Sequence, residues 1–460
     1  MHKTAKNIAV AAVAAGAVAA FAAVPEVTYV HMEQASSSRE VTIQYKFTGD
    51  DAVITLDVET NNAAGGWASI GGEAVCNAQG EVWRKVEKVS DNTVHVIKWH
   101  PDHSWKDAAG NGFKVADGGA RAKVTAWALD NTPDYMVVDI TAGAQQNTQR
   151  YYPAVDFLPG SSLGQKGAVT NNAEYKTTQL VMRKIMASGV KWTMGSTTTE
   201  TKRDDNEATH LVELTNNYYI GVFQITQAQW AQIRPGDYPS FFTVDRDMRP
   251  VDKVSFNNVR MASGGSNTAD ANAREWPAAP FAGSWLDQLR SRTGLDFDLP
   301  SEAQWEFACR AGHGSGYWGD GSKVLNVYND TNLAKIGRFT YNGGFTNNTV
   351  FSQPPGTVST ANGTAVVGSY LPNSWGLYDM HGNVYEWCLD KYTEDISALN
   401  GRVNLTGDTR CARGGNCCSD WETAKFSRSA YRKATVPSEG YPFYAYGMTG
   451  LRVTCTAGLK

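Results

Sequence analysis

A run of fifteen residues near the C-terminal end, Gly376–Asp390, constrains this chain more than any other stretch. Its sequence, GLYDMHGNVYEWCLD, places the carboxylates of Asp379 and Glu386 among aromatic and aliphatic side chains of the kind that folded proteins bury. An unpaired buried charge costs a great deal of free energy, so each carboxylate needs a metal ion, an Arg or backbone N–H groups as a partner. The fold must supply those partners.

Two kinds of partner are compatible with this run. In the first, Asp379 and Glu386 join the backbone carbonyls of the tight turn at Gly382–Val384 in an all-oxygen ligand set, which is the kind that calcium takes. In the second, the carboxylates are structural, because ion pairs with Arg are common beside aromatic clusters. The spacing of the residues leaves both open.

The run also resembles the signature of the formylglycine-generating enzyme / sulfatase-modifying factor family. Other segments resemble blocks of that family in the same order, across roughly residues 178–456. These segments are Trp192–Gly195 (WTMG), Tyr218–Trp230 (YYIGVFQITQAQW), Pro239–Phe242 (PSFF), Leu299–Ala308 (LPSEAQWEFA), Val367–Trp375 (VGSYLPNSW), Arg413–Asn416 (RGGN), Arg428–Arg432 (RSAYR) and Gly450–Val453 (GLRV). Several blocks in order are far more specific than one short motif.

The resemblance implies an irregular, C-type-lectin-like α+β domain that calcium stabilises. It assigns calcium ligands to Asp379 and Glu386 through their side chains and to Gly382 and Val384 through their carbonyls. This fits the long stretch from Tyr317 to Asn373, which is rich in Gly, Asn, Thr and Pro and has few periodic runs.

The family enzyme oxidises a sulfatase cysteine to formylglycine with oxygen and with copper held by two cysteines. The resemblance places those cysteines, spaced Cys-x4-Cys, just after a Gly-Gly-Ser turn. Here the turn is Gly414–Asn416, and the two positions hold Ser419 and Ala424. Copper(I) prefers thiolates, which neither residue provides. Cys417 and Cys418 are adjacent, so we expect their side chains to diverge rather than to replace the pair.

We therefore expect a non-catalytic, ligand-binding domain without copper. The alternative is a formylglycine-generating oxidase. The related iron-dependent sulfoxide synthases use a histidine cluster, and the spacing of the three histidines of this part, His210, His313 and His381, suggests no metal site.

Aromatic residues near the C-terminal end are candidates for contact with a protein or glycan ligand. Aromatic side chains on loops supply large contact area at low entropic cost. The alternative is that these rings pack in a loop-rich core. The candidates are Trp421, Tyr441, Phe443, Tyr444 and Tyr446. The domain also resembles the variable ligand-binding proteins of diversity-generating retroelements.

The N-terminal residues 1–23 read as a secretory signal peptide. Lys3 and Lys6 precede the apolar segment Ile8–Phe21, and Ala20–Ala22 offers small residues for cleavage. The apolar run is short for a membrane span, which needs about 20 residues. We expect a secreted, periplasmic or cell-surface protein without a membrane span. A net charge of −4 gives no electrostatic case for nucleic acid.

The seven cysteines are an odd number, so at least one is unpaired within a monomer. Cys309 falls on the apolar face of a predicted helix, and we expect it to be a buried free thiol. In an oxidising compartment, Cys417 and Cys418 are expected to form disulfides with Cys388, Cys411 or Cys455.

Residues 38–142 are predicted to form an antiparallel β-sandwich of the immunoglobulin or fibronectin kind. Period-2 alternation recurs there between turn-rich segments. His95, His100 and His103 are interpreted as surface histidines rather than as a metal site, because only His100 and His103 are closely spaced, on a turn. A linker at 143–177 and the sulfatase-modifying-factor domain at 178–456 follow. The expected strands of the module are 41–47, 54–58, 94–99, 123–129 and 135–140.

In the C-terminal part, two capping boxes predict helix starts, Thr226 with Gln229 and Ser301 with Gln304. A third helix is expected at Phe281–Arg292, with Trp285, Leu286 and Leu289 facing inward. Strands are expected at Leu180–Ile185 and Tyr218–Ile225.

Overall fold

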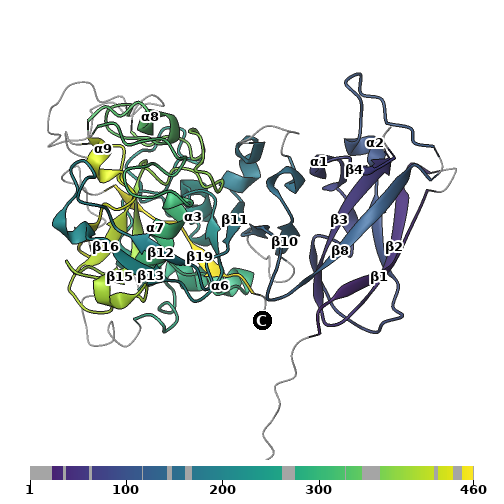
Figure 1. Ribbon diagram of the computed structural model, residues 1–460, viewed down its shortest axis with the longest axis horizontal. Coiled ribbons are helices and arrows are strands. Elements are labelled where there is room, and N and C mark those ends of the chain that lie inside the picture. The colour runs from purple at the N-terminus through teal and green to yellow at the C-terminus, as the bar shows by residue number, and fades with distance from the viewer. Residues whose placement is uncertain are drawn as a thin grey trace, which may run out of the picture.

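The computed structural model shows two lobes of unequal size joined by a layer of strands and short helices (Figure 1). The smaller lobe holds the N-terminal strands β1 to β8, and the larger lobe holds the C-terminal half of the chain. The structure describes residues 23–34, 38–61, 65–116, 118–141, 148–160, 168–261, 275–326, 328–343, 363–418, 423–438 and 448–458. The expected signal segment lies outside these ranges except for Ala23.

The smaller lobe consists of two sheets that enclose one apolar core. One has the strand order β1-β2-β7-β5; in the other β3 pairs with β4, β6 and β8. Buried and half-buried residues alternate along β2, as its sequence pattern predicts. The bounds are β1 Glu26–Gln34, β2 Val41–Thr48, β3 Ala52–Asn61, β4 Trp67–Ser69, α1 Gly72–Val75, β5 Gln79–Gly80, β6 Arg84–Val86, β7 His95–Trp99, α2 Pro101–Ser104 and β8 Ala120–Ala128.

The boundary between the two halves differs from the sequence prediction. Strand β9 (Tyr135–Asp139), which was expected in the sandwich, pairs instead with β11 (Gln179–Ile185) in a sheet of order β10-β9-β11-β14-β19. The expected linker contains β10 (Gln149–Tyr152) of the same sheet. Alternation identifies a strand but not its neighbour, and four of the five residues of β9 are buried. The linker also holds η1 Val155–Phe157, η2 Ala168–Asn171 and η3 Ala173–Lys176.

The larger lobe combines that sheet with a second one of order β17-β16-β15-β18 and with short helices. Apart from α8 (Leu333–Ile336), the described residues of 317–373 form turns, bends and loops with no helix or extended strand, as expected. The bounds are β12 Lys191–Met194, η4 Asp205–Glu207, β13 His210–Glu213, β14 Tyr218–Gly221, α3 Gln227–Ile233, α4 Phe256–Arg260, α6 Trp285–Thr293, α7 Glu302–Arg310, α8 Leu333–Ile336, β15 Tyr385–Lys391, η5 Ser397–Leu399, β16 Arg410–Arg413, α9 Thr423–Phe426, β17 Lys433–Thr435, β18 Thr449–Gly450 and β19 Thr454–Thr456.

The predicted helix starts are confirmed at α3 and α7. In each, the N-cap hydroxyl accepts the backbone N–H of the Gln three residues on, and that Gln side chain accepts the N-cap N–H. Helix α6 begins at Trp285 after the N-cap Ser284, later than predicted, and its inward residues are buried as expected. Strand β14 ends at Gly221, earlier than predicted.

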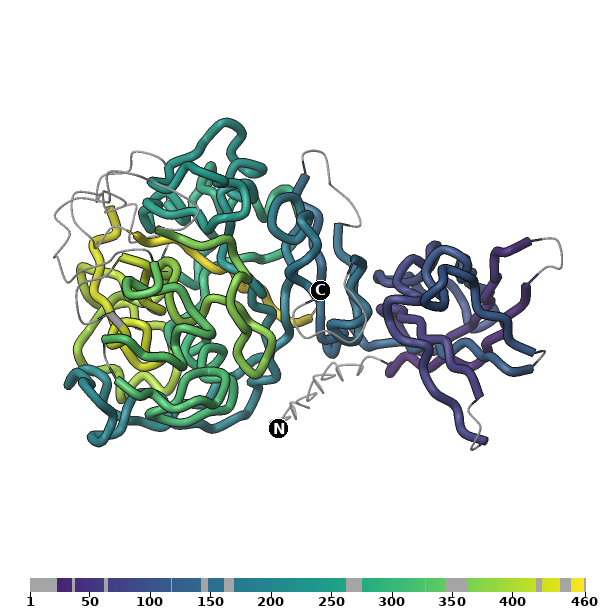
Figure 2. The backbone as a smooth tube through the Cα atoms, turned by 90° about the horizontal axis from the view of Figure 1, so that it is seen from above, coloured from purple at the N-terminus to yellow at the C-terminus, as the bar shows by residue number. Residues whose placement is uncertain are grey.

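One apolar cluster continues from the smaller lobe through the connecting layer into the larger lobe. It includes Ile43 and Leu56 of the smaller lobe and Phe223 and Tyr378 of the larger one. Between them, the rings of Trp83 and Tyr152 stack with centroids 5.2 Å apart. Figure 2 shows the same layer from above, with the described residues 148–160 and 168–185 between the lobes.

Buried Arg–carboxylate pairs hold the irregular part of the larger lobe. Arg413 pairs with Glu306, and Arg432 pairs with Glu302 at 2.6 Å. Arg428 contacts Glu200 and Glu207 at 2.8 and 2.6 Å. Charges leave water only when they are paired and hydrogen-bonded, so these pairs fix the loops that carry them. Within the described ranges, no helix is long and apolar enough to cross a membrane.

Candidate functional site

A tight turn brings the predicted ligand residues together in front of β15. Gly382 has a φ of 128°, and a Cβ at this position would lie 2.2 Å from the carbonyl oxygen of Arg338, so only glycine fits. Asp379 and Asn383 also have positive φ values, 58° and 69°. Such values are uncommon for residues other than glycine, which marks this turn as a shaped feature of the fold.

Four oxygen atoms converge on one point inside this turn. They are the carbonyl oxygens of Asp379, Gly382 and Val384 and the Oε1 atom of Glu386. All four contact one nitrogen, Nε2 of the fully buried Gln224, at 3.2, 3.1, 3.1 and 2.9 Å respectively. We call these four oxygens the oxygen cage. The sequence prediction named all four residues, and the structure brings them together.

The carboxylate of Glu386 has partners besides the cage. Arg452 donates to it through Nε and Nη2, at 3.0 Å to Oε2 and 2.9 Å to Oε1. Trp305 donates its indole N–H to Oε2 at 2.7 Å. The structure therefore contains a Glu386–Arg452 ion pair, which is the alternative to a metal site that the sequence left open. Oε1 of Glu386 nevertheless remains one of the four cage oxygens.

Asp379 contributes to the cage differently from the prediction. Its backbone carbonyl, rather than its side chain, faces the cage. The side chain accepts the backbone N–H of Gly368 at 2.7 Å, and its Oδ1 has no hydrogen-bond partner in the described part of the chain. Burial raises the pKa of this carboxyl to about 6, against the opposing effect of the Gly368 N–H.

His381, in the same turn, is a structural residue. Its Nδ1 lies 2.9 Å from the Ser427 carbonyl, and Gly319 donates its backbone N–H to Nε2 at 2.9 Å. Both ring nitrogens are thus occupied, and burial lowers the pKa of the ring to about 4. Cys309 beside it is a buried free thiol, as predicted, and burial raises its pKa to about 12.

The two positions that the resemblance assigns to copper hold no thiolate. Ser419 lies outside the described residues. Ala424 is buried in an apolar cluster with Trp318, Leu333 and Phe339. The donor set at these positions does not fit copper, because neither side chain is a soft ligand.

The predictions for Cys417 and Cys418 need correction. All seven cysteines are among the described residues, and all are free. The sulfur atoms of Cys417 and Cys418 do not diverge but lie 3.0 Å apart, in a cluster with Phe242 and Met448. They contact each other, not the predicted partners Cys388, Cys411 and Cys455. Burial raises the pKa of the Cys418 thiol well above its usual value.

The candidate ligand-contact residues Trp421, Tyr441, Phe443, Tyr444 and Tyr446 lie outside the described ranges. In the smaller lobe, His100, Asp102 and His103 have potential ligand atoms within 4.8 Å of one another. This is the only group of three such residues in the described part of the chain, and the sequence interpretation of surface histidines leaves out Asp102. That interpretation is wrong for His95, which is buried with its Nδ1 2.9 Å from Oε1 of Glu81. His100 also lies 3.4 Å from a carboxylate oxygen of Glu40.

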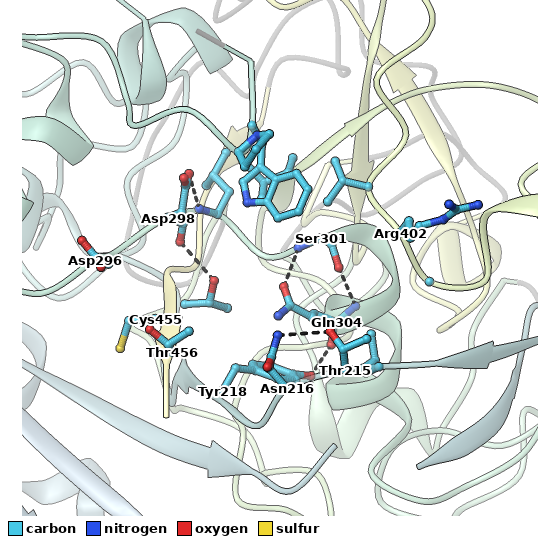
Figure 3. A pocket seen from close by; sticks show the side chains of 18 of the residues that line it. Thr215, Asn216, Tyr218, Asp296, Asp298, Ser301, Gln304, Arg402, Cys455 and Thr456 are labelled. Atoms are coloured by element: carbon cyan, nitrogen blue, oxygen red, sulfur yellow. Dashed lines mark hydrogen bonds between the residues drawn. The ribbon is translucent and has the colours of Figure 1, made fainter. Parts of the chain in front are cut away.

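A cavity of about 750 Å³ opens elsewhere on the larger lobe (Figure 3). Thr215 and Asn216 form one side, Asp296 and Thr456 lie at one end, and Arg402 lies at the other. Trp276, which is 40% exposed, is among the lining residues. Apolar surface with a few polar groups is typical of ligand sites. The sequence reasoning missed this cavity because its walls come from distant segments.

Sequence reasoning also missed Gln224 and Arg452. Gln224 lies in the block YYIGVFQITQAQW and Arg452 in the block GLRV, so both were inside recognised segments. The available signal was a polar residue beside apolar ones in each block. Such a residue is buried only where it has hydrogen-bond partners, which indicates that Gln224 and Arg452 have such partners.

The C-terminal part of this chain is similar to a known protein family. The model of the sulfatase-modifying factor enzyme 1-like domain matches residues 170–454. Formylglycine-generating enzymes of Thermomonospora curvata and Streptomyces coelicolor are 29% and 34% identical over 168 and 166 residues, 34% of this chain in each case. The matches cover 49% and 46% of those enzymes, about half of their length.

A protein named chaperone protein LppX from Paenibacillus barcinonensis is 25% identical over 46% of this chain and 73% of its own length. Among solved structures, PvdO from Pseudomonas aeruginosa is 21% identical with a TM-score of 0.43, covering 60% of this chain and 94% of that one. Treponema denticola variable protein 1 is 22% identical with a TM-score of 0.41, covering 61% and 96%. Because the family model spans more than half of the chain, this protein belongs to the sulfatase-modifying factor enzyme 1-like family.

Proposed function

We propose that the C-terminal domain of this protein is a ligand-binding member of its family that does not oxidise sulfatase cysteines. The observation that carries the proposal is Ala424, a buried alanine at a position where the family's chemistry needs a thiolate. Removing a metal ligand removes the chemistry that the metal performs, whatever fold surrounds it.

The adjacent pair Cys417 and Cys418 does not restore that chemistry. Both side chains are buried, and both come from one side of the site because they are neighbours in the chain. The two adjacent thiols therefore lack the opposed placement that the Cys-x4-Cys spacing provides.

Copper loading tests this proposal. We expect the purified protein to bind no stoichiometric copper and to take up no oxygen with a Cys-containing sulfatase-type peptide. The double variant Ser419→Cys, Ala424→Cys should gain copper binding, with or without turnover. The variant Cys417→Ser, Cys418→Ser is the matched control, and it should behave as the unmodified protein does.

The competing function is a formylglycine-generating oxidase, which the names of the similar enzymes favour. Stoichiometric copper in the unmodified protein, together with formylglycine in the peptide, would establish it. Loss of that copper in the Cys417→Ser, Cys418→Ser variant would then identify the cysteines that hold it.

We also propose that the oxygen cage binds calcium. Three carbonyls and a carboxylate oxygen form a hard donor set, and calcium takes six to eight such oxygens at about 2.3–2.6 Å. A bound ion would tie the Asp379–Val384 turn to β15 and stabilise the lobe. Chelation should then lower the melting temperature of the full chain, because a ligand that binds only the folded state stabilises it. An identical melting curve with chelator and with calcium would refute this proposal.

The ligand that we propose is a protein or a glycan, bound outside the cell or at its surface. Trp421, Tyr441, Phe443, Tyr444 and Tyr446 are one set of candidate contact residues, and the cavity beside Trp276 is a second candidate site. Trp421→Ala and Trp276→Ala, tested in parallel for binding to an array of glycans, would separate them. We further propose that the larger lobe is C-type-lectin-like and that the smaller lobe is an immunoglobulin- or fibronectin-like sandwich serving as a spacer or adhesive module.

A further inference from the structure

The side-chain amide of Gln224 lies near more hydrogen-bond acceptors than it has hydrogens to donate. An amide nitrogen carries two hydrogens and can satisfy two acceptors, yet Nε2 of Gln224 lies within 3.2 Å of the four cage oxygens. Its own Oε1 is buried and has no partner among the described residues. The cage therefore offers twice as many acceptors as the amide can fill, while the amide oxygen accepts nothing.

A neighbouring glutamine shows what a balanced buried amide looks like in this protein. Gln229 donates from Nε2 to two carbonyls, those of Tyr175 and Gln179, at 3.1 and 2.7 Å. Its Oε1 accepts the backbone N–H of Thr226 at 3.0 Å. The two amide hydrogens and the amide oxygen of Gln229 are each used once. Gln227 also has an Oε1 without a partner among the described residues, but its Nε2 faces only two acceptors. The excess of acceptors around Gln224 is therefore a property of the cage and not of buried glutamines in general.

The amide of Gln224 is oriented with its nitrogen, and not its oxygen, toward the cage oxygens. Turning it over would bring Oε1 against four other oxygens, which is repulsive, so the nitrogen must face the cage when no cation is present. A cation at that point reverses the preference. The nitrogen would be repelled, and Oε1 would become an oxygen ligand of the kind that calcium takes.

We propose that Gln224 and a calcium ion exchange at the centre of the oxygen cage. In the ion-free protein, Nε2 of Gln224 holds the four oxygens together. When calcium binds, the side chain withdraws and turns its idle Oε1 to the ion as a fifth protein ligand. This inference rests on the calcium site proposed above and adds a residue that keeps the turn formed without the ion.

Arg452 makes the exchange compatible with the rest of the site. It keeps its contacts with Glu386 and also donates to the carbonyls of Gly221 and Val222 at 2.8 and 2.9 Å. These contacts hold the chain just before Gln224 and the carboxylate on the other side of the cage. The exchange therefore requires movement of one side chain and a contraction of the cage, not a rearrangement of the lobe.

Melting of the full chain in chelator and in millimolar calcium tests the inference, with Gln224→Ala and the matched control Gln227→Ala. Gln227 is also fully buried and donates to two carbonyls, those of Phe242 and Pro250, away from the cage. We expect Gln224→Ala to lower the melting temperature in chelator by several degrees and to recover most of that loss in calcium. Gln227→Ala should lose the same amount in both solutions.

Gln224→Glu sharpens the test by calorimetric titration with calcium. A carboxylate cannot donate to the cage, and it supplies a charged ligand, so this variant should bind calcium at least tenfold more tightly than the unmodified protein. Equal affinity, together with equal losses for Gln224→Ala in chelator and in calcium, would overturn the exchange while leaving the calcium site intact. Calcium binding by Gln224→Glu but not by the unmodified protein would refute the proposed native calcium site and show that Gln224 replaces the ion permanently. Absence of binding by either would overturn both.

Discussion

The two lobes are stabilised by different kinds of interaction. In the smaller lobe, β3 and β8 pair without interruption from Ala52 opposite Ala128 to Thr60 opposite Ala120. Its core is built of aliphatic and aromatic side chains. In the larger lobe, the pairing of β15 with β16 is irregular between Trp387 and Lys391, and fully buried arginines lie between loops and strands.

The difference shows what irregular backbone needs in order to be buried. Sheet residues satisfy their own backbone groups, whereas loops bring unpaired carbonyls into the interior. The buried arginines supply donors for them. Arg432 donates to the carbonyls of Asn206 and Thr393 at 3.2 and 2.8 Å, and Arg452 to that of Tyr378 at 2.7 Å. A guanidinium with five donors can hold a carboxylate and several loops at once.

The largest expected effect comes from dividing the chain at the boundary that the sequence predicts. A fragment of residues 178–460 lacks β9 and β10, so β11 loses a partner strand and becomes an exposed edge. We expect it to aggregate, and a fragment of residues 131–460 to be soluble and to unfold cooperatively. Circular dichroism during heating measures both. If the two fragments melt alike, the connecting layer does not belong to the larger lobe.

Breaking one buried ion pair should have the next largest effect. Arg413→Met leaves Glu306 without one of its two Arg partners in a site that excludes water, and we expect a loss of about 3–5 kcal/mol in the free energy of unfolding. Lys191→Met, which breaks an exposed pair with Glu213, should cost at most about 1 kcal/mol. Urea unfolding measures both. A small loss for Arg413→Met would mean that apolar packing stabilises the larger lobe as it does the smaller one, and that ion pairing contributes little.

In the smaller lobe, the sensitive positions should be apolar. Leu56→Ala removes a buried side chain from the shared core, and we expect a loss of about 2–4 kcal/mol. Gln44→Ala, on the half-buried face of β2, should change stability by less than about 0.5 kcal/mol. If Leu56→Ala lowers the unfolding midpoints of both lobes equally, the apolar cluster that joins them makes the chain one cooperative unit.

Helix caps should give the smallest effects. Ser301→Ala removes the acceptor for the Gln304 N–H, and we expect a loss of about 1 kcal/mol. Thr226→Ala should cost more, because that hydroxyl also donates to the Lys176 carbonyl at 2.7 Å. Thr226→Ser keeps both contacts and should restore most of the stability. Equal losses for the two alanine variants would show that the bond to Lys176 contributes nothing.

The sequence predicted local features where a feature depends on neighbouring residues. The capping boxes of α3 and α7 and the alternation of β2 need only residues within one turn or one strand. The turn at Gly382 belongs to the same class, because Asp379, Gly382, Val384 and Glu386 lie within eight residues of one another. The motif by itself therefore identifies the residues of the cage.

Tertiary structure decided every feature that joins distant segments. It assigned β9 to the sheet of the larger lobe, and it placed Gln224 and Arg452 against residues more than sixty positions away. The physical reason is that sequence fixes what each residue can donate, accept or bury, whereas long-range packing decides which of the many compatible partners it meets.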